Sequence, residues 1–335
     1  MKFSDLSTIK LPHQEDDEPK ELKVRIPLEI IKPPKQEFMA AFNRTEPVSR
    51  DHTAIIAAKF CKRYYFYTIV LGFTSKLTPQ FFKFGKAYHR FREVLEISKE
   101  ETEQKRYEEA IMASIKTYGK HDPLAGAEFD FLTRERLLRS NKKAFEIVKK
   151  ERANVKVLAV EQSFEVFLSD GKTRRGGKAD QFISYGGRKA GRDFKTTSKD
   201  LSNPRTKAYY ERGINPNDQF TGYMVGLTHL TGEFVGMLVV EVLFNSKKSG
   251  PGIIPFLSTL TPWLMAQWEK EQSVVEDMIS IARDRDIWPM EEKNCAFCAF
   301  RSVCKSGTEQ AQMDQLKKEF IQRPWDYKNL GEDND

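Results

Sequence analysis

Three strand-like segments joined by two short turns constrain the fold of this chain more than any other feature. Apolar residues alternate or cluster over residues 155–168, as they do in strands. Asp170-Gly171 is a strong hairpin turn, and Gly186-Gly187 is a second turn. Residues 176–185 and 189–195 are therefore predicted to be the second and third strands of one antiparallel unit.

Helical patterns lie on both sides of this unit. A cap at Ser49 or Asp51 starts a helix that the apolar run 55–70 continues as far as Gly72, with Cys61 in its buried interior. Further helices are predicted over residues 79–97, 101–118, 133–152, 218–230 and 262–286.

Two later segments complete the predicted sheet. Residues 233–245 are apolar at most positions, which is typical of a central strand, and residues 253–257 are its short partner. Asn203-Pro204 and Asn215-Pro216 are predicted to bracket a loop. This order of elements predicts an α/β fold, or an α+β fold, with a core sheet flanked by helices and an N-terminal helical region.

The positive charge of the chain is concentrated around the same strands. The chain has 335 residues and a net charge of +7, but the window 172–207 alone has a balance of +8. Its eleven cations are Lys172, Arg174, Arg175, Lys178, Arg188, Lys189, Arg192, Lys195, Lys199, Arg205 and Lys207. This window indicates a site where a polyanion binds, and Tyr209 and Tyr210 follow it as aromatics on which bases could stack. The alternative is a solvated charged hairpin.

Composition excludes several classes of protein. A hydrophobic fraction of 39%, with 12% aromatic residues, is enough for a core, so a wholly disordered chain is excluded. No stretch reaches the roughly 18 consecutive apolar residues of a membrane span. Charged residues enter at Lys2 and Asp5, before a signal-peptide core could form. We therefore expect a cytoplasmic protein with no membrane partner.

Two acids and a lysine are predicted to meet on the sheet. Strand residues two apart point to the same face, so Asp193 and Lys195 share a side. A hairpin register with Asp180 opposite them would place two carboxylates and an ammonium in one pocket. Two carboxylates bind a hard cation such as Mg²⁺, and a lysine can orient or deprotonate an attacking water. The alternative is an ordinary surface pair, because the spacing D-x-K is common.

These residues and two further motifs resemble the PD-(D/E)XK nuclease superfamily. Gly177-Lys178-Ala179-Asp180, followed by a turn and by Asp193-Phe194-Lys195, is similar to its core motif of two acids and a lysine on adjacent strands. Upstream, Gly85-Lys86-Ala87-Tyr88-His89 with Glu93 resembles the helix of RecB-type nucleases that contributes a metal-binding histidine. Downstream, Gln219-Phe220-Thr221-Gly222-Tyr223 is similar to the Gln-x-x-x-Tyr motif of that branch.

Each motif has a plainer interpretation when it is taken alone. His89 lies on an aromatic helix, where a histidine is more often part of the core, and Gln219 and Tyr223 are one helical turn apart like any i, i+4 pair. The order of the four motifs along the chain carries the resemblance. One departure from the family is that Lys178 precedes the first acid and Gln181 follows it, where hydrophobic residues are usual, which makes the strand register less certain.

The resemblance implies a metal-dependent DNA exonuclease with a restriction-endonuclease-like core. His89, Asp180 and Asp193 would hold Mg²⁺ or Mn²⁺, with the backbone carbonyl of Phe194 as a further ligand. Lys195 would position or activate the attacking water and stabilise charge on the phosphorus.

The resemblance also implies roles for the downstream helix. Gln219 would orient Lys195 or the scissile phosphate, and Tyr223 would contact the strand. Glu161 is a weaker match, as an outer acid near the metal.

Four cysteines form a second constellation, because Cys295, Cys298 and Cys304 cluster near the end of the chain and Cys61 precedes the strands. Four thiolates suit either tetrahedral zinc or an iron–sulfur cluster, so their number does not choose between them. One cysteine before the core and three after it resembles the iron–sulfur staple of the AddB nuclease domain and of CRISPR-associated RecB-like exonucleases. The resemblance implies a 4Fe-4S cluster whose role is structural, tying the front of the chain to its end.

The predicted organisation has five parts: an extended leader (1–48), a helical region with Cys61 and His89 (49–153), a nuclease core (154–287), a cluster-binding segment (288–306) and a C-terminal tail (307–335). The expected substrate is DNA, as single strands or ends, in phage or prokaryotic recombination, repair or processing. A helicase, recombinase or adaptation complex is the expected partner, since no phosphate-binding helicase loop is present. The alternative function is a catalytically silent DNA-binding subunit of such a complex.

Overall fold

Five strands form one mixed sheet in the computed structural model, which describes residues 44, 47, 49–76, 78–119 and 130–326. The strands are β2 (Val155–Phe167), β3 (Arg174–Tyr185), β4 (Arg188–Thr197), β5 (Met237–Ser246) and β6 (Gly250–Thr259), in the spatial order β2-β3-β4-β5-β6. All neighbours are antiparallel except β4 and β5, which run parallel. The predicted α/β sheet is confirmed, but the centre is β4, and the segment predicted as central, β5, lies beside it.

Both predicted turns of the three-stranded unit are confirmed. Gly171, Gly186 and Gly187 have φ values of 66°, 55° and 80°, which glycine adopts readily and other residues rarely do. The carboxylate of Asp170 accepts hydrogen bonds from the backbone amides of Lys172 (2.9 Å) and Thr173 (2.8 Å), which fixes the first turn. The local sequence therefore determines where β2 ends and β3 returns.

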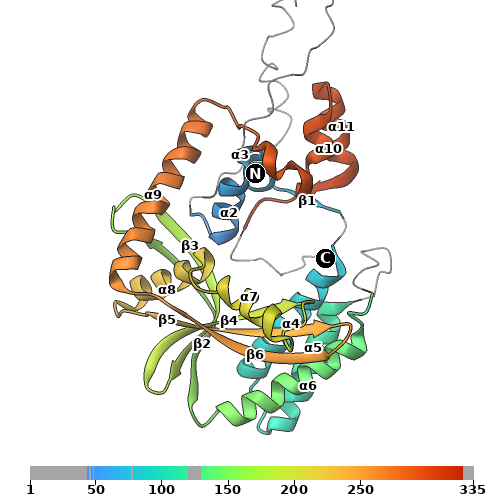
Figure 1. The fold of residues 1–335 in the computed structure, drawn as a ribbon, viewed down its shortest axis with the longest axis vertical. Helices are drawn as coiled ribbons and strands as arrows, with labels where there is room; N and C mark the ends of the chain where they lie inside the picture. The colour runs from blue at the N-terminus through green and yellow to red at the C-terminus, as the bar shows by residue number, and fades with distance from the viewer. Residues whose placement is uncertain (1–43, 45–46, 48, 77, 120–129, 327–335) are drawn as a thin grey trace, which may run out of the picture. The chain divides into compact units, whose positions relative to one another are not determined.

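Helices cover the two faces of the sheet (Figure 1). On one face lie α4 (Gln80–Ile97), α5 (Glu103–Tyr118) and α6 (Arg134–Glu151), and on the other lie α8 (Asp218–Thr231) and α9 (Pro262–Asp284). Alternation along β5 supplies both cores: Leu243 packs with the first group, whereas Val240 and Val242 pack with the second. The sheet is thus buried on both sides, as its apolar strands predict.

The single helix predicted over residues 55–70 is wrong at Cys61. Helix α2 (His52–Phe60) ends there, because Cys61 is extended with φ −169° and ψ 127°. A short helix α3 (Lys62–Tyr65) and a π-helix η2 (Phe66–Val70) follow. The segment 289–291 inserts at the break: the amide of Glu291 lies 3.4 Å from Sγ of Cys61, and the amide of Arg63 donates to Pro289. A contact with a distant segment overrides the local helical pattern.

A helix also replaces the loop predicted between the two Asn-Pro pairs. The side chain of Asn203 accepts from the amides of Arg205 (2.9 Å) and Thr206 (3.3 Å) and caps α7 (Pro204–Arg212). Proline is favoured at the first helical position, where its missing N–H costs nothing. The pair Asn203-Pro204 is thus a helix start.

The C-terminal part of the described chain packs against the N-terminal elements α2 and β1. After the 3-10 helix η4 (Glu292–Phe297) come α10 (Arg301–Lys305), α11 (Glu309–Glu319) and β7 (Phe320–Gln322). Strand β7 pairs antiparallel with β1 (Phe73–Ser75). The indole of Trp325 then donates to the carboxylate of Asp51, 3.2 Å away, which also caps α2. This part of the predicted tail is therefore folded against the N-terminal helices.

Some expectations fall outside these residues. The leader predicted over 1–48, except residues 44 and 47, and the acidic stretch 331–335 lie outside the described ranges. Within those ranges, the structure has no helix that combines the length and apolar character needed to cross a membrane.

Candidate active site

The register of β3 and β4 brings the two predicted acids together. Gln181 pairs with Arg192, so Asp180 and Asp193 occupy the next row, beyond the last paired residues. There β4 continues alongside β5 instead, with Asp193 beside Val240 and Lys195 beside Val242. Because the β3–β4 ladder has opened, Oδ2 of Asp180 accepts a hydrogen bond from the amide of Phe194 at 2.6 Å.

Lys195 faces Asp193 within this opening. Its Nζ lies 3.1 Å from Oδ1 and 2.9 Å from Oδ2 of the Asp193 carboxylate, which is buried. The ammonium therefore contacts both oxygens of this carboxylate. The predicted group of two carboxylates and one ammonium is thus assembled.

Helix α4 brings His89 to the same acids. Nδ1 of His89 lies 3.4 Å from Oδ1 of Asp180, and its ring stands edge-on to Phe194 with centroids 6.0 Å apart. A Cβ at Gly85 would lie only 3.1 Å from Oγ1 of Thr196, so a glycine at this point lets the helix approach the end of β4.

A buried polar group fixes α4 against the sheet and was not predicted from the sequence. Arg92, which is fully buried, forms an ion pair with Glu241 on β5, and the hydroxyl of Tyr88 donates to the same carboxylate at 2.8 Å. The Arg92 guanidinium also stacks over Phe194, 4.2 Å from the ring centroid. Since Tyr88 and Arg92 flank His89, this triad sets where His89 stands relative to Asp180.

The charges of the site shift one another's pKa values. Burial is the main cause that raises the pKa of Asp193 to about 6, with Asp180 adding to it and Lys195 opposing it. Burial also acts on Asp180, but His89 and Lys195 outweigh it and lower the pKa of that carboxyl. Burial disfavours the charge on Lys195, yet Asp193 and Asp180 raise its pKa above the ordinary value, so Lys195 is a cation.

The predicted Gln219–Tyr223 pair lies on α8 beside the acids. The side-chain amide of Gln219 donates a hydrogen bond to the Tyr223 hydroxyl at 2.8 Å. Burial raises the pKa of Tyr223 well above its ordinary value, and the charges of Asp193 and Asp180 raise it further. Tyr223 therefore stands close to both acids.

Two more acids border Asp180. Glu161 has a positive φ of 51°, which is rare for a residue with a side chain, and it pairs with Lys178 at 2.7 Å. Burial raises the pKa of Glu161, and the charges of Asp180 and Glu93 add to this effect. Glu161, which the sequence matched only weakly as an outer acid, therefore lies next to Asp180.

Tyr210 and His52 also stand near Lys195, and neither was assigned to the site from the sequence. Burial raises the pKa of Tyr210, which the charges of Lys195 and Asp193 also influence. Burial lowers the pKa of His52 to about 4, and Lys195 and Lys59 lower it while Asp218 opposes them. The local sequence around these two residues does not predict a place in the site, because only the fold brings helices α7 and α2 to the end of β4.

The donor set of the site fits a hard divalent cation. It offers the carboxylates of Asp180 and Asp193 and the imidazole of His89. In the described part of the chain, however, no three histidine, cysteine or acidic side chains stand close enough to hold one ion as placed. Asp193 faces Lys195, so the two side chains would have to part for Asp193 to act as a ligand.

The basic window is mostly neutralised by ion pairs within the protein. Six of its eleven cations have acidic partners: Arg174 with Glu165, Arg175 with Glu276, Lys178 with Glu161, Lys189 with Glu233, Arg192 with Glu151, and Lys195 with Asp193. Arg175 and Arg192 are buried. The prediction that the whole window binds a polyanion is therefore too broad. Across the described ranges, ion-pair partners are absent for the remaining five: Lys172, Arg188, Lys199, Arg205 and Lys207.

The four cysteines line one cavity between α2 and the C-terminal segment. All are free thiols, and aromatic side chains including Tyr64, Tyr67 and Phe300 complete the walls. Burial is the main cause that raises the pKa of the thiols of Cys298 and Cys304. Among the described residues, these sulfurs are nevertheless not close enough to hold a single metal ion.

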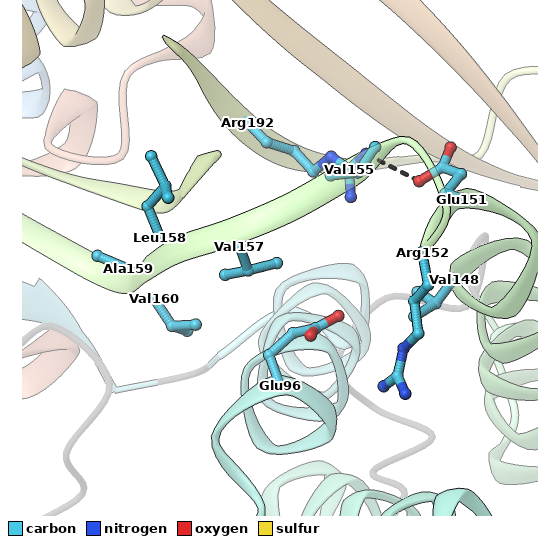
Figure 2. A pocket seen from close by; sticks show the side chains of 10 residues that line it. All are labelled: Glu96, Val148, Glu151, Arg152, Val155, Val157, Leu158, Ala159, Val160 and Arg192. Atoms are coloured by element: carbon cyan, nitrogen blue, oxygen red, sulfur yellow. Dashed lines mark hydrogen bonds and ion pairs between the residues drawn. The ribbon is translucent and has the colours of Figure 1, made fainter. Parts of the chain in front are cut away.

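A further cavity lies away from the acids, on the sheet face covered by α4 and α6 (Figure 2). Its volume is about 350 Å³, and its walls include Glu96, Arg152 and apolar residues of β2. Arg192 and Glu151, which also line it, form an ion pair at 2.8 Å. None of the predicted site residues borders this cavity.

Comparison with known proteins identifies a family for most of the chain. A family model described as the PD-(D/E)XK nuclease superfamily matches residues 52–305. No curated protein matches the sequence. Among solved structures, a proposed exonuclease from Eubacterium rectale is 12% identical with a TM-score of 0.41, covering 85% of this chain and 93% of its own. An alkaline exonuclease from Laribacter hongkongensis is 13% identical with a TM-score of 0.27, covering 62% and 96%.

Proposed function

This chain belongs to the PD-(D/E)XK nuclease superfamily, and we propose that it is a deoxyribonuclease of the RecB-like branch that degrades DNA as an exonuclease with Mg²⁺ or Mn²⁺. The observation that carries this proposal is the group of Asp180, Asp193 and Lys195 at the opened end of the β3–β4 ladder, with His89 against Asp180. These are the residue types that the superfamily motif places on adjacent strands.

His89, Asp180 and Asp193 would hold the divalent cation. The cation, when bound, supplies Lewis-acid stabilisation of the phosphoryl oxygens and lowers the pKa of a water. With Asp193 as a ligand, Lys195 would no longer be held in its ion pair with that carboxylate. Lys195 would then position or activate the attacking water, or stabilise charge on the phosphoryl oxygen.

Tyr223 and Gln219 contribute from α8. The Gln219 amide holds the Tyr223 hydroxyl at 2.8 Å, which orients that hydroxyl toward the acids and toward the strand being cut. Gln219 therefore acts through Tyr223, as a positioning residue. Glu161 would be an outer acid near the metal, held in place by its ion pair with Lys178.

The cysteine cavity would hold a 4Fe-4S cluster through Cys61, Cys295, Cys298 and Cys304. Support comes from the four thiols on one cavity and from the break in the helix at Cys61. Cysteine thiolates are the ligands that hold iron–sulfur clusters. Its role would be structural, in the context of DNA recombination, repair or processing.

The test is a degradation assay on protein purified without air. End-labelled single-stranded and duplex DNA is incubated with Mg²⁺, with Mn²⁺ or with chelator, using wild type, Asp193→Ala and Asp277→Ala. Asp277 is an exposed acid on α9 and serves as the matched control. Metal-dependent loss of label in wild type and Asp277→Ala, but not in Asp193→Ala, supports the proposal. DNA that is bound yet never cut would favour the silent DNA-binding subunit instead.

A further inference from the structure

The exposed surface of α7 is the remaining basic surface next to the acids. We define the α7 platform as Lys199 together with helix α7 (Pro204–Arg212). No residue of this helix is buried. The stretch 199–212 has four cations, Lys199, Arg205, Lys207 and Arg212, against two acids, and in the part of the chain that the structure describes none of the four has an ion-pair partner.

The helix has two distinct faces. Thr206 and Tyr210, one turn apart, are half-buried, and the Tyr210 ring packs against Phe256 with centroids 5.8 Å apart. Arg205, Tyr209 and Arg212 follow one another at spacings of four and three residues, so they form a stripe on the outer face. Tyr210 therefore anchors the helix to the sheet, while the stripe faces outward.

An aromatic ring lies in the middle of this stripe. Tyr209 is 69% exposed, and the ammonium of Lys199 stands over its ring, 5.2 Å from the centroid. A large exposed ring among unpaired cations contributes nothing evident to the core. The same combination, cations that neutralise phosphates and a ring that stacks on a base, is how proteins hold unpaired nucleic-acid strands.

The platform is also placed next to the proposed chemistry. Tyr210, the residue after Tyr209, is close enough to Lys195 and Asp193 for their charges to act on it. Helix α7 crosses in front of the sheet in Figure 1. A strand lying along the outer face of α7 would thus have its backbone within a few nucleotides of the acids.

We propose that the α7 platform binds a single strand of DNA, with one unpaired base stacked on Tyr209 and the backbone on Arg205 and Arg212. The cations attract the phosphates of any strand, and the exposed ring of Tyr209 selects an unpaired one. The bases of a duplex are stacked on each other and offer no exposed face along its length. This inference rests on the proposed function in that it names the form of DNA presented to the same site.

The test is a binding measurement that needs no turnover. Fluorescence anisotropy with chelator present compares a labelled single strand of thymidines with a blunt duplex of equal length, using the full chain. Tyr209→Ala is expected to weaken single-strand binding about 5- to 100-fold and Tyr209→Phe, the matched control, less than about twofold. Duplex binding is expected to change by less than about twofold in both.

A salt series gives a second measurement that does not depend on Tyr209. The double variant Arg205→Ala, Arg212→Ala should lower the slope of log affinity against log salt for the single strand by about 1.4, at about 0.7 per phosphate contact. The proposal is overturned if Tyr209→Ala binds the single strand as wild type does, if Tyr209→Phe loses as much as Tyr209→Ala, or if the slope is unchanged. Since no cleavage is measured, these results stand apart from the outcome of the degradation assay.

Discussion

The acid site on the sheet and the cysteine cavity differ in what holds them in place. At the acid site the side chains already contact one another: Asp180 has His89 and the Phe194 amide, and Asp193 has Lys195. At the cysteine cavity, Cys61 contacts backbone atoms of the segment 289–291, and the four thiols share a cavity. The comparison teaches that the side chains of the acid site contact one another in pairs, whereas the cysteines share a cavity that, on our proposal, a bound cluster would fill.

The strongest test of this difference is removal of one cysteine. Cys298→Ser should abolish the iron content and brown absorbance near 400 nm, and it should destabilise the contact of residues 289–304 with α2 by several kcal/mol, because binding energy is folding energy when ligands come from distant segments. Iron analysis and thermal unfolding measure this. Ala299→Ser, exposed in the same segment, is the control and should keep its iron. A colourless wild type that contains zinc would refute the cluster.

The acid site should instead depend on the buried triad beneath it. Glu241→Gln leaves the guanidinium of Arg92 buried without its charge partner, which costs about 3–5 kcal/mol of folding stability. Urea unfolding measures the loss. Glu233→Gln, which breaks the exposed pair with Lys189, should cost less than about 1 kcal/mol. Equal losses in the two variants would show that the triad does not hold α4.

A substitution of Lys195 should distinguish the effect on metal binding from the effect on turnover. Lys195→Met keeps the length of the side chain and removes its charge, so degradation should fall about 100-fold or more while the affinity for Mn²⁺ is retained or improved. Initial rates of DNA degradation and Mn²⁺ titration measure the two effects. Lys270→Met, an exposed lysine of α9, should leave both unchanged. Full activity in Lys195→Met would remove this residue from the site.

His52 lies on the helix between the two regions and gives the smallest effect. Its folded-state pKa of about 4 is below the ordinary 6.5, so its contribution to stability is present above pH 6.5 and is lost as the pH falls through about 4. Wild type should lose about 1–2 kcal/mol relative to His52→Gln between pH 7 and pH 4. Urea unfolding at several pH values measures this. Parallel profiles for the two proteins would contradict it.

The elements predicted correctly are those with local causes. Asp170-Gly171 and Gly186-Gly187 make their turns from their own backbone preferences, and the second turn fixes the β3–β4 register that brings Asp180 and Asp193 together. The resemblance then led to His89, which no local rule would distinguish from a core histidine.

The elements missed depend on distant partners. Cys61 breaks its helix because residues 289–291 bind there, and Arg92 is explained only by Glu241, which lies 149 residues away. Asn203-Pro204 was ambiguous, since the same pair starts loops and helices. The basic window was misjudged because net charge along a sequence does not reveal which cations are paired in the fold.

The most direct measurement is Mn²⁺ binding to the full chain, followed by electron paramagnetic resonance. Wild type should bind the ion, Asp180→Asn and Asp193→Asn should each weaken binding about tenfold or more, and Asp277→Asn should match wild type. If Asp180→Asn and Asp193→Asn bind Mn²⁺ as tightly as wild type does, these two carboxylates are not the metal ligands and the proposed site is wrong.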